Sequence, residues 1–162
     1  MVLDNILLYG VFLIHILLVL GAVLLIAGFK VPSWIKDRAL WLGFYTSLIA
    51  TAGSLYYSEF LNYTPCELCW YQRIFMYVLP LIFGSAIIFN DKKVIRYALP
   101  ISVAGFLIGV YHYLVQVTQV VVCTGEVDCA VRYTFGFGYI TIPFMALTTF
   151  LLTVIFAWLA KK

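Results

Sequence analysis

Four cysteines in two close pairs are the residues of this sequence best suited to chemistry. Cys66 and Cys69 have two residues between them, and Cys123 and Cys129 have five. Cysteines at such spacings form small disulfide rings, and a strained or exposed ring exchanges readily with other thiols. Two other uses remain open at this point, namely two structural disulfides, or a zinc site that takes the thiolates as ligands.

The first pair lies where a helix is expected to begin. Pro65 favours a helix starting near Cys66, so both thiols would lie at the positive end of that helix, where thiol pKa values fall. Arg73 follows Cys69 by four residues and would therefore lie one turn further along the same face. A fixed cation there would stabilise a Cys69 thiolate and bind the carbonyl oxygen of an electron acceptor. The alternative is an arginine that anchors the end of an apolar segment among lipid headgroups.

The second pair is expected to close a small exposed loop. Gly125 lies between its two cysteines and allows a tight turn. Glu126 and Asp128 place negative charge beside Cys129, which disfavours a thiolate there. The same two acids would also suit a basic patch on a partner protein, and the sequence leaves both interpretations open.

The elements that must position these residues are hydrophobic helices. Of 162 residues, 65% are hydrophobic and only 10% are charged, which is more apolar surface than a globular core can bury. Strands of a membrane barrel would alternate polar and apolar residues, and these runs do not. We therefore expect an all-α polytopic membrane protein. Five stretches are long and apolar enough to span a bilayer: Ile6–Phe29, Ala39–Ser58, Trp70–Phe89, Tyr97–Gln116 and Tyr139–Ala160.

The distribution of basic residues predicts the orientation in the cell membrane. If the five spans alternate, most lysines and arginines fall on one side, which should be cytoplasmic. They are Lys30, Lys36, Arg38, Lys92, Lys93, Arg96, Lys161 and Lys162. The N-terminus is then outside, the C-terminus is cytoplasmic, and both cysteine pairs lie on the outer, oxidising face. The first span lacks the basic start and the cleavage site of a signal peptide, so we expect it to be retained. A net charge of +3 without a basic, aromatic-lined groove argues against nucleic acid as a partner.

The segment PCELCWYQR, residues 65–73, resembles the signature of the DsbB family of membrane thiol oxidases, and most closely its BdbC-like branch. The similarity continues in order through SLYYSEF (54–60), IFMYVLPLIFG (74–84), GVYHYL (109–114) and FGYITIPFMAL (137–147). It implies a four-helix bundle that carries a quinone near the outer surface. That bundle would comprise residues 39–162, and residues 1–38 would add an extra N-terminal transmembrane helix and a cytoplasmic loop.

The resemblance also implies a function and a role for each site residue. Members of the family reoxidise an extracytoplasmic thioredoxin-fold thiol oxidase, of DsbA-like or BdbD-like type, and pass two electrons to a ubiquinone or menaquinone. By position, the reduced partner would attack Cys123, and Cys129 would resolve the mixed disulfide directly or through a transient bond to Cys66. Cys69 would face the quinone as a thiolate, and Arg73 would hold a quinone oxygen.

The role of His112 and the function of the protein each have alternative interpretations. The resemblance places His112 near the quinone, whereas the residue by itself would more often be a packing histidine. Vitamin K epoxide reductase-like thiol oxidases use a similar bundle, but in them the loop pair precedes the close pair, opposite to the order here. A non-enzymatic metal-binding or structural membrane protein is the second rival, and bound zinc would indicate it.

Overall fold

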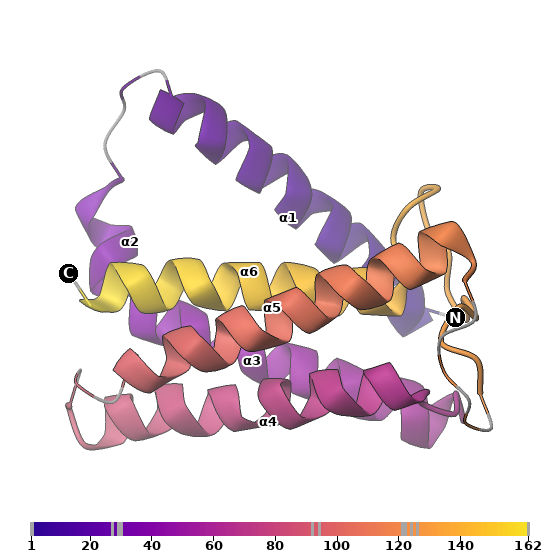
Figure 1. Cartoon of the computed structure of the whole chain (residues 1–162). Coiled ribbons are helices and arrows are strands. Elements are labelled where there is room, and N and C mark those ends of the chain that lie inside the picture. Colours follow the sequence, from indigo (N-terminus) through magenta and orange to yellow (C-terminus); the bar gives the residue numbers. More distant parts are fainter. Residues whose placement is uncertain are drawn as a thin grey trace.

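A computed structural model describes residues 2–26, 28, 31–91, 93, 95–120, 123, 125 and 127–161. This part of the chain is helical and contains no strand, only an isolated bridge between Gly136 and Ile140. The elements in Figure 1 are α1 (Val2–Ile26), α2 (Ser33–Asp37), α3 (Ala39–Leu55), η1 (Tyr56–Phe60), α4 (Glu67–Ile88), α5 (Ile95–Thr118) and α6 (Ile142–Lys161). The expected all-α fold is confirmed.

Helices α3 to α6 form the bundle, because α3 packs on α4, α4 on α5, α5 on α6, and α6 on α3. Large apolar side chains from α4 and α6, including Leu79, Phe83 and Phe150, are fully buried between them. Glycines stand opposite two of these rings, Gly43 against Phe83 and Gly105 against Phe150. The missing side chains let the helices approach closely, as is common in membrane bundles.

Within the described residues, each of the five stretches expected to span a membrane contains a helix. Three helices of this part of the chain are long and apolar enough by themselves: Glu67–Ile88, Ile95–Thr118 and Ile142–Ala160. Helix α3 is shorter, but it continues directly into the π-helix η1. Helix α6 begins at Ile142, not at Tyr139 as expected, because the chain from Gly136 to Ile140 forms a bridged turn with Gly138 at φ +78°.

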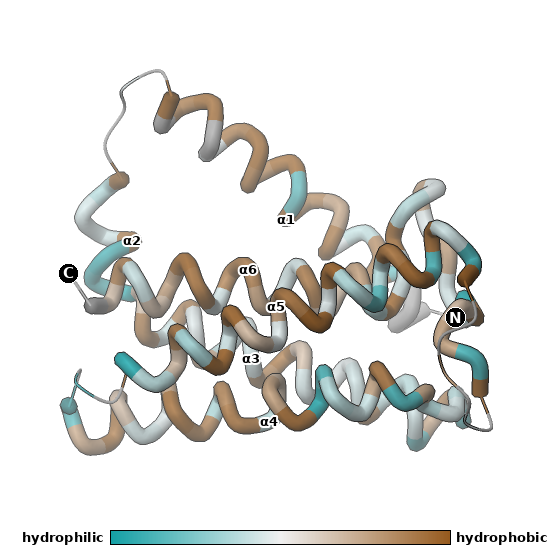
Figure 2. Tube along the Cα trace, viewed as in Figure 1, coloured by the Kyte–Doolittle hydropathy of each residue, from teal (hydrophilic) through white to brown (hydrophobic). Residues whose placement is uncertain are grey.

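Helix α1 lies outside the ring of four helices. Figure 1 shows its N-terminal half beside the end of the bundle that carries the α5–α6 loop, and its C-terminal half angled away from α6. Side chains along this second half, such as Val19 and Ile26, are exposed, and Figure 2 shows that the helix is hydrophobic over most of its length. An apolar helix with an exposed face requires lipid as its surroundings.

The glycine contacts yield a prediction about stability. A Cβ added at Gly105 would overlap the ring of Phe150, whereas one added at Gly10 of α1 would meet nothing within 4 Å. We expect Gly105→Ala to lower the free energy of unfolding by about 1–3 kcal/mol, because the α5–α6 contact is overpacked. Gly10→Ala is the matched control and should not lower it. Thermal unfolding in detergent measures both, and equal midpoints would contradict this account of the packing.

Candidate redox site

The first cysteine pair begins α4. Cys66 is the N-cap residue, with φ −73° and ψ 173°, and its Sγ accepts a hydrogen bond from the backbone N–H of Cys69 at 3.4 Å. Pro65 directly precedes it, so the helix begins where the sequence predicts. Both cysteines are present as thiols, and their sulfur atoms lie 3.0 Å apart. The pair is therefore placed to close into a disulfide without movement of the helix.

The second pair, Cys123 and Cys129, forms a disulfide. Both cysteines are buried, whereas Gly125 between them is exposed. The loop folds back over the ends of α4 and α5, where Leu68 and Val115 join the same apolar cluster.

Of the two acids of this loop, Asp128 lies within the described residues and Glu126 does not. Asp128 accepts a hydrogen bond from the backbone N–H of Ala130 at 3.0 Å, so its carboxylate supports a turn. Glu126, also expected to influence Cys129, lies outside the described residues.

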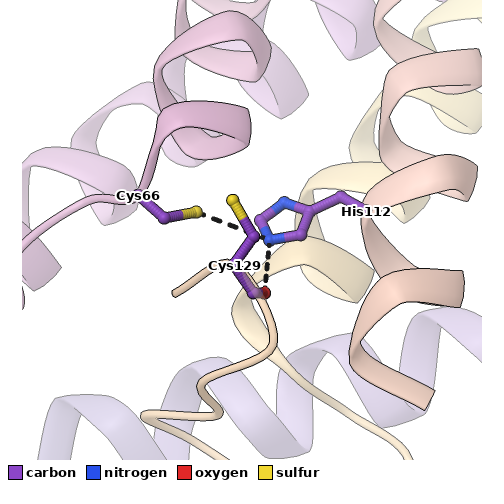
Figure 3. Close-up of side chains that lie close together, drawn as sticks. All are labelled: Cys66, His112 and Cys129. Atoms are coloured by element: carbon purple, nitrogen blue, oxygen red, sulfur yellow. Dashed lines mark hydrogen bonds between the residues drawn. The ribbon is translucent and has the colours of Figure 1, made fainter. Parts of the chain in front are cut away.

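His112 of α5 connects the two cysteine pairs, as Figure 3 shows. Its Nε2 lies 3.6 Å from Cys66 Sγ and 3.2 Å from the carbonyl oxygen of Cys129. The sulfur of Cys66, the sulfur of Cys129 and a ring nitrogen of His112 all lie within 4.8 Å of one another. The two pairs are thus neighbours in space although a whole helical hairpin separates them in sequence, and a sulfur–sulfur exchange between them requires only a short displacement.

The same three groups are the metal-ligand cluster found in the described part of the chain. A zinc ion would need Cys129 as a thiolate. Its sulfur is bonded to Cys123 instead, so the arrangement favours disulfide exchange over metal binding.

Gln72 holds the other side of the His112 ring. His112 Nδ1 lies 3.4 Å from Gln72 Oε1, and both side chains are buried. The two ring nitrogens therefore face different partners, Nδ1 the Gln72 amide and Nε2 the Cys66 sulfur and the Cys129 carbonyl oxygen, which fixes the orientation of the ring. Gln72 was not among the predicted site residues, although a polar residue one position before Arg73 in an apolar helix was a signal for it.

The thiolate of the first pair is favoured at Cys66. The hydrogen bond from the Cys69 thiol lowers the pKa of Cys66 from an ordinary value near 9 to about 4; burial acts in the opposite direction, and His112 lowers it further. The resemblance to the DsbB family implies a thiolate at Cys69. Cys66 is the N-cap residue, so its sulfur accepts from the backbone N–H of Cys69, and as a thiolate it would also accept from the Cys69 S–H.

A cavity of about 220 Å³ lies on the other side of this pair, and Cys69 and Arg73 line it. Its remaining walls come largely from apolar residues of α1, α3 and α6. Neither Cys66 nor His112 is among the lining residues. The structure thus brings Cys69 together with Arg73 at the cavity, and Cys66 together with His112 and Cys129 at the loop.

Ser54 of α3 positions Arg73. The guanidinium donates to Ser54 Oγ from Nε at 3.1 Å and to the Ser54 carbonyl oxygen from Nη2 at 3.3 Å. It also lies over the ring of Trp70, 5.2 Å from the centroid. Within the part of the chain that the structure describes, no carboxylate pairs with Arg73, so its charge is available to a ligand in the cavity. Ser54 was not identified as a site residue beforehand, because its contact with Arg73 joins two helices.

Comparisons with known proteins agree with this geometry. The family model described as "Disulfide bond formation protein DsbB" matches residues 36–160. The chain belongs to the DsbB family. It is 45% identical over 132 residues to "Disulfide bond formation protein C" of Bacillus subtilis, covering 78% of this chain and 96% of that protein. It is 49% identical over 124 residues to a "Probable disulfide formation protein" of Oceanobacillus iheyensis, covering 72% and 83%. No solved structure matches the chain.

Membership of the DsbB family has two consequences. It makes the chain a membrane oxidoreductase of disulfide formation, in agreement with the resemblance seen in PCELCWYQR and against the vitamin K epoxide reductase-like alternative. The family match begins at residue 36, so α1 (Val2–Ile26) lies outside it.

The hydrogen bonds to Cys66 yield a prediction about pH. In the reduced protein we expect alkylation of Cys66 by iodoacetamide to be at its plateau at pH 7 and to fall only as the pH approaches 4. Only the thiolate reacts, and a lowered pKa leaves the thiolate populated at neutral pH. Cys69→Ala removes the S–H donor, so the midpoint should rise towards the ordinary cysteine value. Mass spectrometry of the labelled peptide measures both profiles, and a midpoint near 9 in the unsubstituted protein would contradict the assignment.

Proposed function

We propose that this chain is a thiol:quinone oxidoreductase of the cytoplasmic membrane. It reoxidises an extracytoplasmic thioredoxin-fold dithiol oxidase, of DsbA-like or BdbD-like type, and so supports protein disulfide formation. The observation that carries the proposal is the division of one cysteine pair between two environments. Cys66 Sγ lies within 4.8 Å of Cys129 Sγ, whereas Cys69 lines an apolar cavity together with Arg73.

The first stage of the reaction takes place at the loop. A thiolate of the reduced partner attacks Cys123, the Cys123–Cys129 bond breaks, and Cys129 leaves as a thiolate. Cys129 then attacks Cys66 of an oxidised Cys66–Cys69 pair, which releases Cys69 as a thiolate. The second thiolate of the partner then attacks the partner's sulfur in the mixed disulfide. This forms the disulfide of the partner and releases Cys123 as a thiolate. Cys123 attacks Cys129, which restores the loop disulfide and releases Cys66.

This sequence ends with the loop disulfide formed and Cys66 and Cys69 not bonded to each other, as both pairs are found in the structure. Two electrons have moved from the partner to Cys66 and Cys69. The resemblance to the family implied a Cys69 thiolate. We place it at the stage in which Cys66 is bonded to Cys129, because Cys66 cannot carry the negative charge while it is in a disulfide. At that stage Arg73 can stabilise the Cys69 thiolate, because it lies four residues further along α4 on the same face of the helix.

The cavity fits a quinone in shape and in chemistry. Its lining is largely aliphatic, and Arg73 supplies a hydrogen-bond donor suited to a carbonyl oxygen. It follows α3 from Ser54 to Thr46, a distance of about 12 Å at 1.5 Å per residue. A quinone held there by Arg73 would supply the oxidising power for the first pair. Cys66 and Cys69 would close into a disulfide and give up two electrons and the proton of Cys69, and the second proton would come from solvent because Cys66 is a thiolate. Ubiquinone and menaquinone types share the carbonyl groups and apolar tail that these residues recognise.

We assign to His112 a role at the cysteines in place of the quinone contact that the resemblance implied. Its Nε2 is within reach of Cys66 Sγ and of the Cys129 carbonyl oxygen, and Gln72 fixes the ring. A proton on Nε2 would stabilise the Cys66 thiolate when that sulfur is the leaving group. His112 is therefore a positioning residue for the exchange between the two pairs.

The charges at the two ends of the bundle support the proposed orientation. Lys36 and Arg38 precede α3, and Lys93 and Arg96 lie between α4 and α5. Both sulfur pairs lie at the opposite ends of these helices. Basic residues favour the cytoplasmic side, so the cysteines face outwards.

The function is tested by mixing purified protein, a reduced thioredoxin-fold partner and a soluble quinone, and following quinone absorbance. We expect steady turnover that stops in each of four variants, because every sulfur takes part in a bond exchange. The variants are Cys66→Ser, Cys69→Ser, Cys123→Ser and Cys129→Ser. Arg96→Ala, at the other end of the bundle, is the control and should retain full turnover. Full activity in any one of the cysteine variants would refute the relay.

The variant His112→Asn distinguishes a role of this residue at the cysteines from a contact with the quinone. We expect kcat to fall by about tenfold or more, because a hydrogen bond to a charged group contributes about 1.5–3 kcal/mol, with the quinone KM unchanged. Steady-state kinetics at varied quinone concentration separates the two parameters. A raised quinone KM with an unchanged kcat would return His112 to the quinone site.

A further inference from the structure

Helix α1 forms one wall of the cavity that Cys69 and Arg73 line. Its residues Leu7, Val11 and Ile14 contribute to the lining. They are spaced four and three residues apart, which places them along one face of the helix. The cavity is therefore enclosed by α1 in addition to α3, α4 and α6.

Specific contacts hold this part of α1 against the bundle. The ring of Phe12 stacks on that of Phe137 at a centroid distance of 4.5 Å, and Tyr9 meets Phe137 edge-on at 5.4 Å. His15 Nε2 is hydrogen-bonded to Thr148 Oγ1 of α6 at 2.8 Å. Thr148 itself lines the cavity, so the point of attachment is also part of the wall.

The opposite face of α1 has a different environment. Leu13, two residues from Val11, is 57% exposed, and the exposure continues along the half of the helix that turns away from the bundle in Figure 1. A single helix thus offers one face to the cavity and another to lipid.

We propose that α1 is a structural part of the quinone site in this protein, and that Leu7, Val11 and Ile14 set the size and shape of quinone that it accepts. This inference rests on the proposed function of the cavity. The family match begins at residue 36, so the wall is an addition to the bundle that defines the DsbB family. The match to the Bacillus subtilis relative covers 96% of that protein but only 78% of this chain.

The test is direct binding of a benzoquinone with a decyl tail to the full-length protein in detergent. Both cysteine pairs are first oxidised, so that the quinone cannot be reduced, and affinity is measured by equilibrium dialysis. We expect Val11→Trp, which fills the cavity from the α1 side, to weaken binding by about tenfold or more. Leu13→Trp places the same side chain on the exposed face and should bind like the unsubstituted protein. Arg73→Ala should also weaken binding.

The outcomes separate this inference from the proposed function. If Arg73→Ala weakens binding while Val11→Trp does not, α1 is no part of the site, although the quinone site itself stands. If Leu13→Trp weakens binding as much as Val11→Trp, the effect is not specific to the cavity face and the inference fails. If Arg73→Ala binds normally, the proposed quinone site is wrong. If Val11→Trp does not fold, Val11→Phe replaces it, and its quinone affinity is compared with that of Leu13→Trp in the same way.

Discussion

The chemistry of this protein depends on a helix N-terminus that places two sulfurs in contact but in different surroundings. Residues three apart on an α-helix lie on the same side, about 60° apart around the axis. Cys66 and Cys69 use this geometry at the start of α4, with their sulfurs 3.0 Å apart. One sulfur faces the loop disulfide and the other faces the cavity. This arrangement would let the proposed water-borne dithiol and lipid-soluble oxidant exchange electrons without direct contact.

The polar groups around the pair reduce the cost of negative charge in an apolar environment. A buried anion is expensive unless hydrogen bonds or an opposite charge compensate it. A Cys66 thiolate would accept from the backbone N–H and the S–H of Cys69, and His112 lies beside it. Cys69 has Arg73 one turn along the helix, itself oriented by Ser54. Each sulfur thus has its own means of stabilising a thiolate, which a relay needs because the charge moves from one to the other.

Features that depend on local sequence could be predicted. The hydrophobic stretches gave five helices, Pro65 marked the start of α4, and the spacing of four residues put Arg73 on the face of Cys69. These follow from helix periodicity and from the conformational limits of proline. The start of α6 was misplaced, because a turn around Gly138 with positive φ interrupts an apolar run without any change in hydrophobicity.

Features that depend on contacts between distant segments could not be predicted in the same way. His112 is separated from Cys66 by 46 residues, and only the packing of α5 on α4 brings them together. The burial of Cys123 and Cys129 likewise results from a loop folding over helix ends. Gln72 and Ser54 act through side chains on neighbouring helices, and nothing in their own segments indicates which partner they meet. A hydrophobicity pattern predicts that a residue is buried, but it does not predict which residues pack against it.

The position of α1 follows from the physics of association in lipid. Apolar surface alone gives little drive for one helix to bind another there, because the lipid tails are equally apolar. Packing and interhelical hydrogen bonds must hold α1, and the Phe12–Phe137 stack and the His15–Thr148 hydrogen bond are contacts of this kind. Both lie in the half of α1 that carries the cavity-lining residues, whereas the other half turns away. A helix that served only as an anchor would need no such contacts. These contacts hold α1 where it would limit solvent access to the cavity, and a less solvated Arg73 would interact more strongly with a carbonyl oxygen.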